Sequence, residues 1–146
     1  MNELVELTHE ECRELLGTVV VGRVAMCTPM GPRITPVNYT LHGEAIVFRT
    51  APYTELGTYG RDTELAFEID NIDYEHHRGW SVVAIGRGHI VEDPEEVQEI
   101  RDISDPRPWV AGQRHLYMKL EWRDLTGRRI GGDWDRSSMS PIQRAL

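Results

Sequence analysis

The sequence lacks the features that mark membrane, secreted or nucleic-acid-binding proteins. No apolar run approaches the roughly 18 residues that a transmembrane helix requires, and the longest, such as residues 81–85, have the length of a strand. The acidic amino-terminal stretch has neither the basic start nor the apolar run of a signal peptide. Lys and Arg number 16 against 24 Asp and Glu, a net charge of -8, whereas nucleic acids and anionic membranes require a basic surface. We therefore expect a cytoplasmic protein with no nucleic-acid or membrane partner.

Residues with obvious catalytic or metal-binding spacing are also scarce. The two cysteines, Cys12 and Cys27, form no metal or redox motif, and both are expected to be buried thiols. Ser81 has no nucleophile-elbow motif around it. The adjacent His76 and His77 lack the spacing of zinc ligands. The sequence therefore predicts no metal site and identifies no catalytic residue.

The chain is long enough to bury a hydrophobic core of its own. Its 146 residues, 40% hydrophobic and 27% charged, are typical of one globular domain. Thr8 and Glu11 form a capping box at the start of a short helix, and Gly17 is expected to end that helix as a left-handed cap. Because the carboxyl-terminal residues are polar and aperiodic, we expect a domain at 1–132 and a frayed tail at 133–146.

From residue 18 onward the apolar residues recur with a period of two, which is typical of strands. Tight turns separate the first three strands, which favours an antiparallel meander over a β-α-β unit. Gly86 and Gly88 predict a bend or bulge, and Thr126-Gly127 a break. The six expected strands span 18–28, 34–41, 45–49, 65–72, 79–91 and 115–130, with a polar loop at 71–78 and further short helices at 52–59 and 93–102. This pattern predicts a mainly β protein, a small antiparallel barrel with short peripheral helices.

The stretch 33–56 combines features of an anion site and a ring-binding edge. Arg49 ends a predicted strand and is followed by Thr50, Thr54 and the amino end of a helix. A guanidinium offers paired donors to phosphate oxygens, and first-turn amides attract anions. Pro36 within a strand requires an edge or a bulge, so its neighbours have free backbone groups that could bond the pyrimidine edge of a flavin. Flat apolar walls could come from the tryptophans, Trp80, Trp109, Trp122 and Trp134.

The order and spacing of several short motifs carry a resemblance to a known family. Through these motifs, residues 3 to 131 resemble the pyridoxamine 5'-phosphate oxidase-like proteins, a flavin-binding split-barrel family, and especially its small actinobacterial-type members. The motifs are Gly22-Arg23-Val24-Ala25, Pro36-Val37-Asn38-Tyr39, Val47-Phe48-Arg49-Thr50, Phe67-Glu68-Ile69-Asp70, Gly79-Trp80-Ser81-Val82 and Thr126-Gly127-Arg128-Arg129.

This resemblance implies a six-stranded antiparallel split β-barrel that forms a homodimer, with FMN or the deazaflavin F420 in grooves at the interface. It also implies hydride transfer to or from a small organic substrate, with the cofactor carrying the chemistry. The cofactor-binding residues that it implies are Val37, Asn38 and Tyr39 along the ring, Arg49, Thr50 and Thr54 at the phosphate, and Trp80 and Trp109 as walls.

The chain departs from the family pattern at the expected phosphate site. Relatives commonly have Gly-Thr-Lys-Leu after Ala-Pro, whereas this chain has Tyr53-Thr54-Glu55-Leu56. A carboxylate about 5 Å from a phosphate costs about 3 kcal/mol per unit charge at an effective dielectric constant near 20. An FMN-dependent oxidoreductase remains the favoured hypothesis. One alternative is an F420-dependent reductase, in which arginines such as Arg23, Arg33 or Arg128 could hold the anionic tail of F420. The other is a non-enzymatic split barrel that has lost FMN phosphate binding.

Overall fold

The computed structural model describes residues 3–131 of the chain, which form a barrel with three short helices. The helices are α1 (His9–Leu16), α2 (Glu55–Tyr59) and α3 (Pro94–Ser104). The strands are β1 (Leu4–Glu6), β2 (Val21–Thr28), β3 (Gly31–His42), β4 (Ala45–Thr50), β5 (Glu64–Asp73), β6 (Arg78–Ile90) and β7 (Leu116–Ile130). None of the helices in this described part has the length and apolarity needed to span a bilayer.

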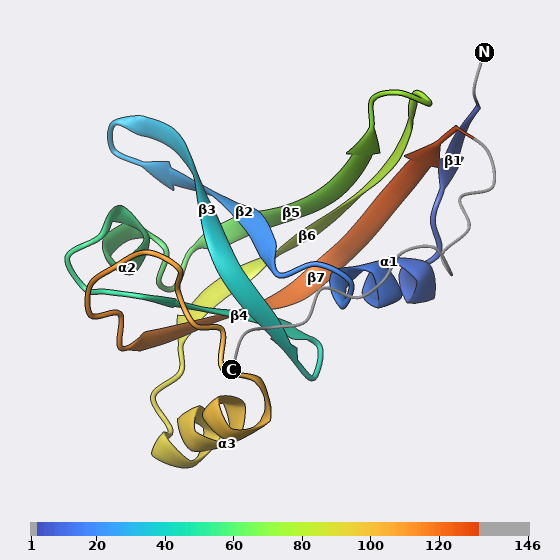
Figure 1. The fold of residues 1–146 in the computed structure, drawn as a ribbon. Helices are drawn as coiled ribbons and strands as arrows, with labels where there is room; N and C mark the ends of the chain where they lie inside the picture. The colour runs from blue at the N-terminus through green and yellow to red at the C-terminus, as the bar shows by residue number, and fades with distance from the viewer. Residues whose placement is uncertain (1–2, 132–146) are drawn as a thin grey trace.

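The strands pair antiparallel in the order β1-β7-β4-β3-β2-β5-β6, and a further pairing between β6 and β7 closes the ring (Figure 1). Six strands thus make the barrel, and the short β1 adds to the end of β7. The expected mainly β, six-stranded antiparallel barrel with peripheral helices is confirmed, with β1 as an unexpected seventh strand. Its three residues are too few for a period of two to be recognised.

The core fills the barrel with side chains from alternate strand positions, as the period of two requires. Tyr39 and Phe67 are fully buried and meet edge to face, with ring centroids 4.8 Å apart. The Tyr39 hydroxyl donates to the carbonyl of Leu16, which ties the end of α1 to the barrel. A Cβ at Gly22 would lie 2.1 Å from the Phe67 ring, so only glycine fits beneath that ring.

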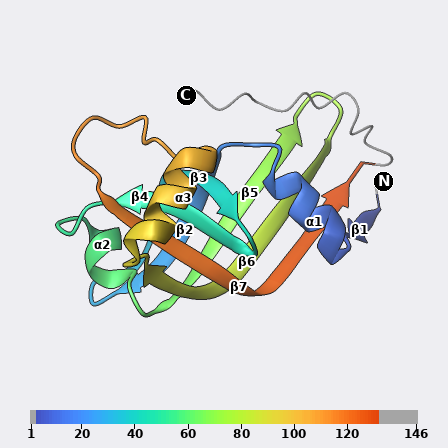
Figure 2. The same cartoon turned by 90° about the horizontal axis from the view of Figure 1, so that it is seen from below.

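The three helices cover different parts of the barrel (Figures 1 and 2). Helix α1 lies near one end and buries Cys12, Leu15 and Leu16, as its capping box and apolar spacing predict. Helices α2 and α3 lie toward the other end. Helix α3 buries Ile100 in a second apolar cluster with Tyr117 of β7, Val47 of β4 and Val91, which follows β6. The segment after α3, residues 105–115, has no regular structure and returns to the barrel at β7.

Several local expectations are wrong. Gly17 caps α1 with a right-handed φ of -83°, because its N–H bonds the carbonyl of Glu14 in a tight final turn that needs no left-handed residue. Cys27 is exposed, because its side chain is on the outer face of β2. Residues 71–73 belong to β5 and pair with β6, and β7 continues through 126–127 without a break. The predicted irregularity in β6 is confirmed by a register shift between Ile85 and Gly86. The predicted tail at 133–146 lies outside the described residues.

Candidate functional site

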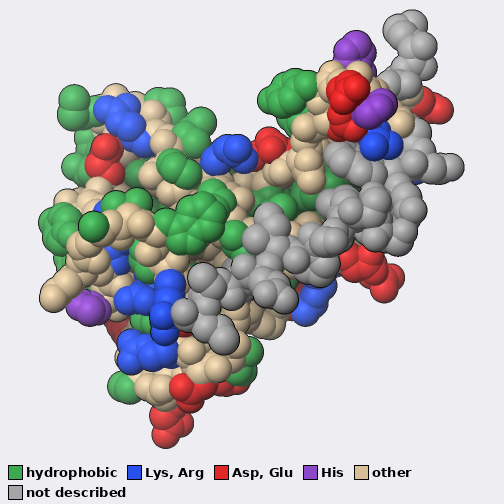
Figure 3. Space-filling model, in the orientation of Figure 1, with side chains coloured by type: hydrophobic (Ala, Val, Ile, Leu, Met, Phe, Trp, Pro, Cys, Tyr) green, Lys and Arg blue, Asp and Glu red, His purple; other side chains and the backbone are tan. Residues whose placement is uncertain are grey.

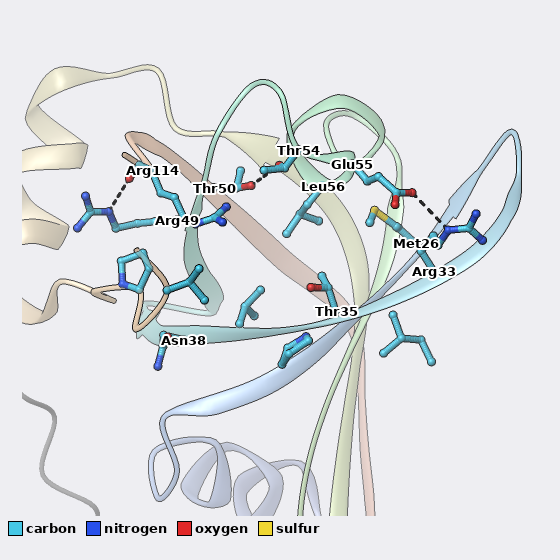
Figure 4. Close-up of a pocket in the computed structure, with 15 residues that line it drawn as sticks. Met26, Arg33, Thr35, Asn38, Arg49, Thr50, Thr54, Glu55, Leu56 and Arg114 are labelled. Carbon is cyan, nitrogen blue, oxygen red and sulfur yellow. Dashed lines mark hydrogen bonds and ion pairs between the residues drawn. The ribbon is translucent and has the colours of Figure 1, made fainter. Parts of the chain in front are cut away.

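The barrel is split between β3 and β4, and a cavity occupies the split. These strands pair only through residues 39–42 and 45–48. Residues 31–38 of β3 pair with β2 along one edge, and no strand among residues 3–131 pairs with their other edge. A cavity of about 420 Å³ lies against that edge, bounded also by the end of β4, by α2 and by the segment 105–115 (Figure 4). Its volume is within the range of small-molecule sites.

Five of the eight predicted cofactor-binding residues line this cavity. They are Val37, Asn38, Arg49, Thr50 and Thr54. The other three lie elsewhere. The Tyr39 side chain is in the barrel core, and Trp80 is 5% exposed and packs in the same core. The Trp109 side chain is 72% exposed, while its backbone N–H donates to Asn38 Oδ1 at 3.0 Å beside the cavity.

The two threonines form a closed hydrogen-bond chain at the start of α2. Thr54 accepts from the N–H of Gly57 at 3.0 Å and donates its hydroxyl proton to the carbonyl of Ala51 at 2.8 Å. The Thr50 hydroxyl lies 2.7 Å from that of Thr54 and therefore donates to it. Because each hydroxyl has one proton, neither has one left for a ligand phosphate in this arrangement.

Arg49 is already engaged by other groups of the protein. Its Nη1 lies 3.1 Å from Asp105 Oδ2, its Nε donates to the carbonyl of Arg114 at 2.9 Å, and its guanidinium carbon is 5.2 Å from the centre of the Tyr117 ring. The side chains of Arg49 and Asp105 are only 16% and 14% exposed. The Tyr117 hydroxyl donates to Asp105 Oδ1 at 2.8 Å, and burial is the main cause that raises the pKa of Tyr117, so this donor stays protonated. Figure 4 shows the Arg49 guanidinium directed away from the cavity.

Two other arginines line the cavity. Arg33 of β3 pairs with Glu55, with 3.4 Å between Nε and Oε2, and both side chains are well exposed. Glu55 is therefore at the cavity, as its sequence position indicated, but its charge is opposed by Arg33. Arg114 has a buried Nε with no hydrogen-bond partner in the described part of the chain. In Figure 4 its guanidinium extends toward Thr50 and the cavity.

A second, more open cavity of about 650 Å³ lies between the β5–β6 hairpin and the end of β7. It has apolar residues with exposed side chains at its rim, including Ile72 and Tyr74. Glu68 and Asp70 also line it and share Arg23 as an ion-pair partner. Burial, and then the neighbouring Asp70, raise the pKa of Glu68. Among residues 3–131, no group of His, Cys, Asp and Glu side chains could hold a metal ion.

Sequence reasoning did not identify Arg114, Asp105 or Tyr117. Each is more than 50 residues from Arg49 in the chain. Tyr117 meets Arg49 directly across the pairing of β4 with β7, whereas Asp105 and Arg114 meet it because 105–115 folds back against β4. No motif indicates that return, since the segment has neither regular periodicity nor a turn signature that predicts its partner.

Comparison with known proteins identifies relatives of this chain. The family model for pyridoxamine 5'-phosphate oxidase matches residues 8–129. The uncharacterized protein Rv0080 of Mycobacterium tuberculosis is 32% identical over 136 residues, covering 90% of this chain and 88% of that protein.

Two solved structures are similar over most of the described chain. A FAD binding protein from Mycobacterium smegmatis is 26% identical with a TM-score of 0.73, covering 86% of this chain and 97% of that one. A candidate pyridoxamine 5'-phosphate oxidase from Corynebacterium glutamicum is 27% identical with a TM-score of 0.75, covering 87% and 98%. With the family match across 8–129, these similarities show that the chain belongs to the pyridoxamine 5'-phosphate oxidase family.

Proposed function

We propose that this protein is a cytoplasmic, flavin-dependent oxidoreductase that binds FMN in the cavity between β3 and β4 and transfers hydride to or from a small organic substrate. The observation that carries the proposal is the edge of β3 at residues 31–38, which pairs with no other described strand and lies beside a cavity with arginines at its rim. A flavin ring has donors and acceptors along its pyrimidine edge and an anionic tail, so it matches a free backbone edge next to cations.

The family membership and the M. smegmatis relative support a flavin. FAD contains the same ring system as FMN, so a FAD binding relative is consistent with a ring site shared by both nucleotides. Backbone groups near Val37 and the Asn38 side chain would bind the ring edge, and apolar groups such as Leu56 and Val110 would exclude water from its face. When bound, the flavin would supply the hydride chemistry, and the residues described here would hold and orient it.

We also propose that the protein is a homodimer whose second copy completes the ring site. Ile34 and Val110 line the cavity although they are 72% and 64% exposed, and Trp109 beside them is 72% exposed. In Figure 3, hydrophobic side chains gather at this side of the molecule, next to a hollow in the surface. A second copy would cover these apolar groups. Sedimentation showing only monomer at micromolar concentration contradicts this part of the proposal.

The proposal is tested by what the purified protein binds. We expect a yellow protein, or quenching of FMN fluorescence on titration, with bovine serum albumin as the control for non-specific quenching. A colourless protein that leaves FMN fluorescence unchanged rules out the FMN form. Activity with reduced F420 and none with FMN instead supports the F420 alternative. Arg33 at the cavity rim favours that alternative, because the longer anionic tail of F420 could reach Arg33.

A non-enzymatic binding protein is the second candidate, and Glu55 is the observation that favours it. Its carboxylate lines the cavity where an FMN phosphate would need positive charge. If Glu55 alone prevents binding, Glu55→Lys should create FMN affinity that the wild-type protein lacks. Absence of FMN binding in both proteins excludes Glu55 as the deciding residue.

A further inference from the structure

The arginines that line the cavity differ in whether their charge is already opposed. Arg33 faces Glu55, and Arg49 faces Asp105. Arg114 has no ion-pair partner in the described part of the chain, and its Nε is buried without a hydrogen bond. A buried donor without an acceptor is unfavourable, so a ligand acceptor at this position would stabilise it. Among the described residues, Arg114 is therefore the cation at this cavity whose charge is free to act on a ligand.

Arg49 connects the two ends of the segment that carries Arg114. Its Nη1 binds the Asp105 carboxylate at the start of 105–114, and its Nε binds the Arg114 carbonyl at the end. Between these ends, the Trp109 N–H is held by Asn38 of β3. The segment is thus attached to the barrel at its start, middle and end. Because the Arg49 bond is to the Arg114 backbone, the Arg114 side chain remains free to extend toward Thr50 (Figure 4).

Direct binding of a phosphate by Arg49 would require this arrangement to break. Its guanidinium would have to leave a largely buried carboxylate, and an unpaired buried charge is strongly unfavourable. Thr50, the expected partner of Arg49 at the phosphate, has its hydroxyl proton engaged by Thr54. Both observations favour another cation at the anionic end of the ligand.

We infer that Arg114 binds the anionic group of the ligand, and that Arg49 is a positioning residue that holds 105–114 in place. The anion is identified by chemistry as a phosphate or a similar oxyanion, because the guanidinium offers paired donors. Its identification as the phosphate of FMN rests on the proposed function. Binding of an oxyanion by Arg114 does not.

The test compares FMN with riboflavin, which has the same ring and no phosphate. Arg114→Gln should weaken FMN binding about 10- to 100-fold, as loss of a charged hydrogen bond does, and leave riboflavin binding unchanged. Asp105→Asn should weaken both ligands by a similar factor, because it loosens the whole cavity wall. Arg107→Gln is the matched control, since Arg107 is in the same segment, 63% exposed and 3.9 Å from Asp105, and it should change neither affinity.

The two possible roles of Arg49, phosphate ligand and positioning residue, predict opposite effects of Asp105→Asn on FMN affinity. If Arg49 were the phosphate ligand, Asp105→Asn would free its charge and strengthen FMN binding with riboflavin unchanged. That result, or an Arg114→Gln protein that binds FMN like wild type, overturns the inference.

Two measurements need no flavin and separate this inference from the proposed function. Titration of the wild-type protein with inorganic phosphate should shift the Nε–H resonance of Arg114, identified by its absence in Arg114→Gln. Hydrogen exchange at 105–115 should accelerate in Asp105→Asn and stay unchanged in Arg107→Gln. If wild type binds neither flavin, the proposed function fails, and these two results decide the inference. An unshifted Arg114 resonance overturns it.

Discussion

The ion pair between Arg49 and Asp105 is expected to contribute strongly to the stability of the fold. The side chains are 16% and 14% exposed, Arg49 Nη1 lies 3.1 and 3.4 Å from the two carboxylate oxygens, and the Tyr117 hydroxyl donates to one of them. Removing one charge of a fully buried pair costs about 3–5 kcal/mol. Asp105→Asn keeps the side-chain shape and one acceptor for Tyr117, and some water reaches the site. We therefore expect a loss of about 2–3 kcal/mol in the free energy of unfolding.

Urea unfolding measures this loss as a lower midpoint with an unchanged m value. For a chain of this size, each kcal/mol lowers Tm by about 2–4 °C, so a Tm decrease of about 5–10 °C is expected. Asp124→Asn is the matched control, because Asp124 pairs with Arg123 at 3.1 Å while the side chains are 55% and 61% exposed. Asp124→Asn should lower the free energy of unfolding by less than about 0.5 kcal/mol. If Asp105→Asn is no more destabilising than Asp124→Asn, the argument from burial is wrong.

Three further perturbations test the core, the cavity and a surface turn. Gly22→Ala puts a methyl group 2.1 Å from the Phe67 ring, so overpacking should cost about 1–3 kcal/mol in urea unfolding, and a wild-type midpoint contradicts that packing. Glu55→Gln should tighten FMN binding about three- to tenfold in a fluorescence titration with riboflavin unchanged, because the carboxylate is exposed and opposed by Arg33; an unchanged FMN affinity places the phosphate away from it. The pKa of Asp73 is lowered to about 2, first by a backbone N–H of the following turn. Because this pKa lies below its unfolded value, near 3.9, the stabilisation of the fold by the ionised Asp73 is complete above about pH 4 and is lost toward pH 2. An NMR titration of the Asp73 carboxyl group with a midpoint near 4 contradicts this prediction.

Much of the barrel could be predicted from the sequence because its signals are local. A period of two determines which face of a strand is buried, and short turns determine that neighbouring strands pair antiparallel. The capping box of α1 depends only on nearby residues. The exposure of Cys27 follows from the same alternation, because Cys27 is on the face of β2 that carries Arg23, opposite the buried Val24 and Met26. The expectation of a buried thiol did not take this phase into account.

The residue types of the site were also determined by the sequence, but their roles were decided by the tertiary structure. The stretch 33–56 brings Asn38, Arg49 and Thr50 to one cavity. The sequence cannot show that Arg49 faces Asp105 and the Arg114 carbonyl, since these groups come from a distant segment without regular structure. Electrostatic interactions depend on distance and burial in three dimensions, and these exist only once 105–115 has folded against β4.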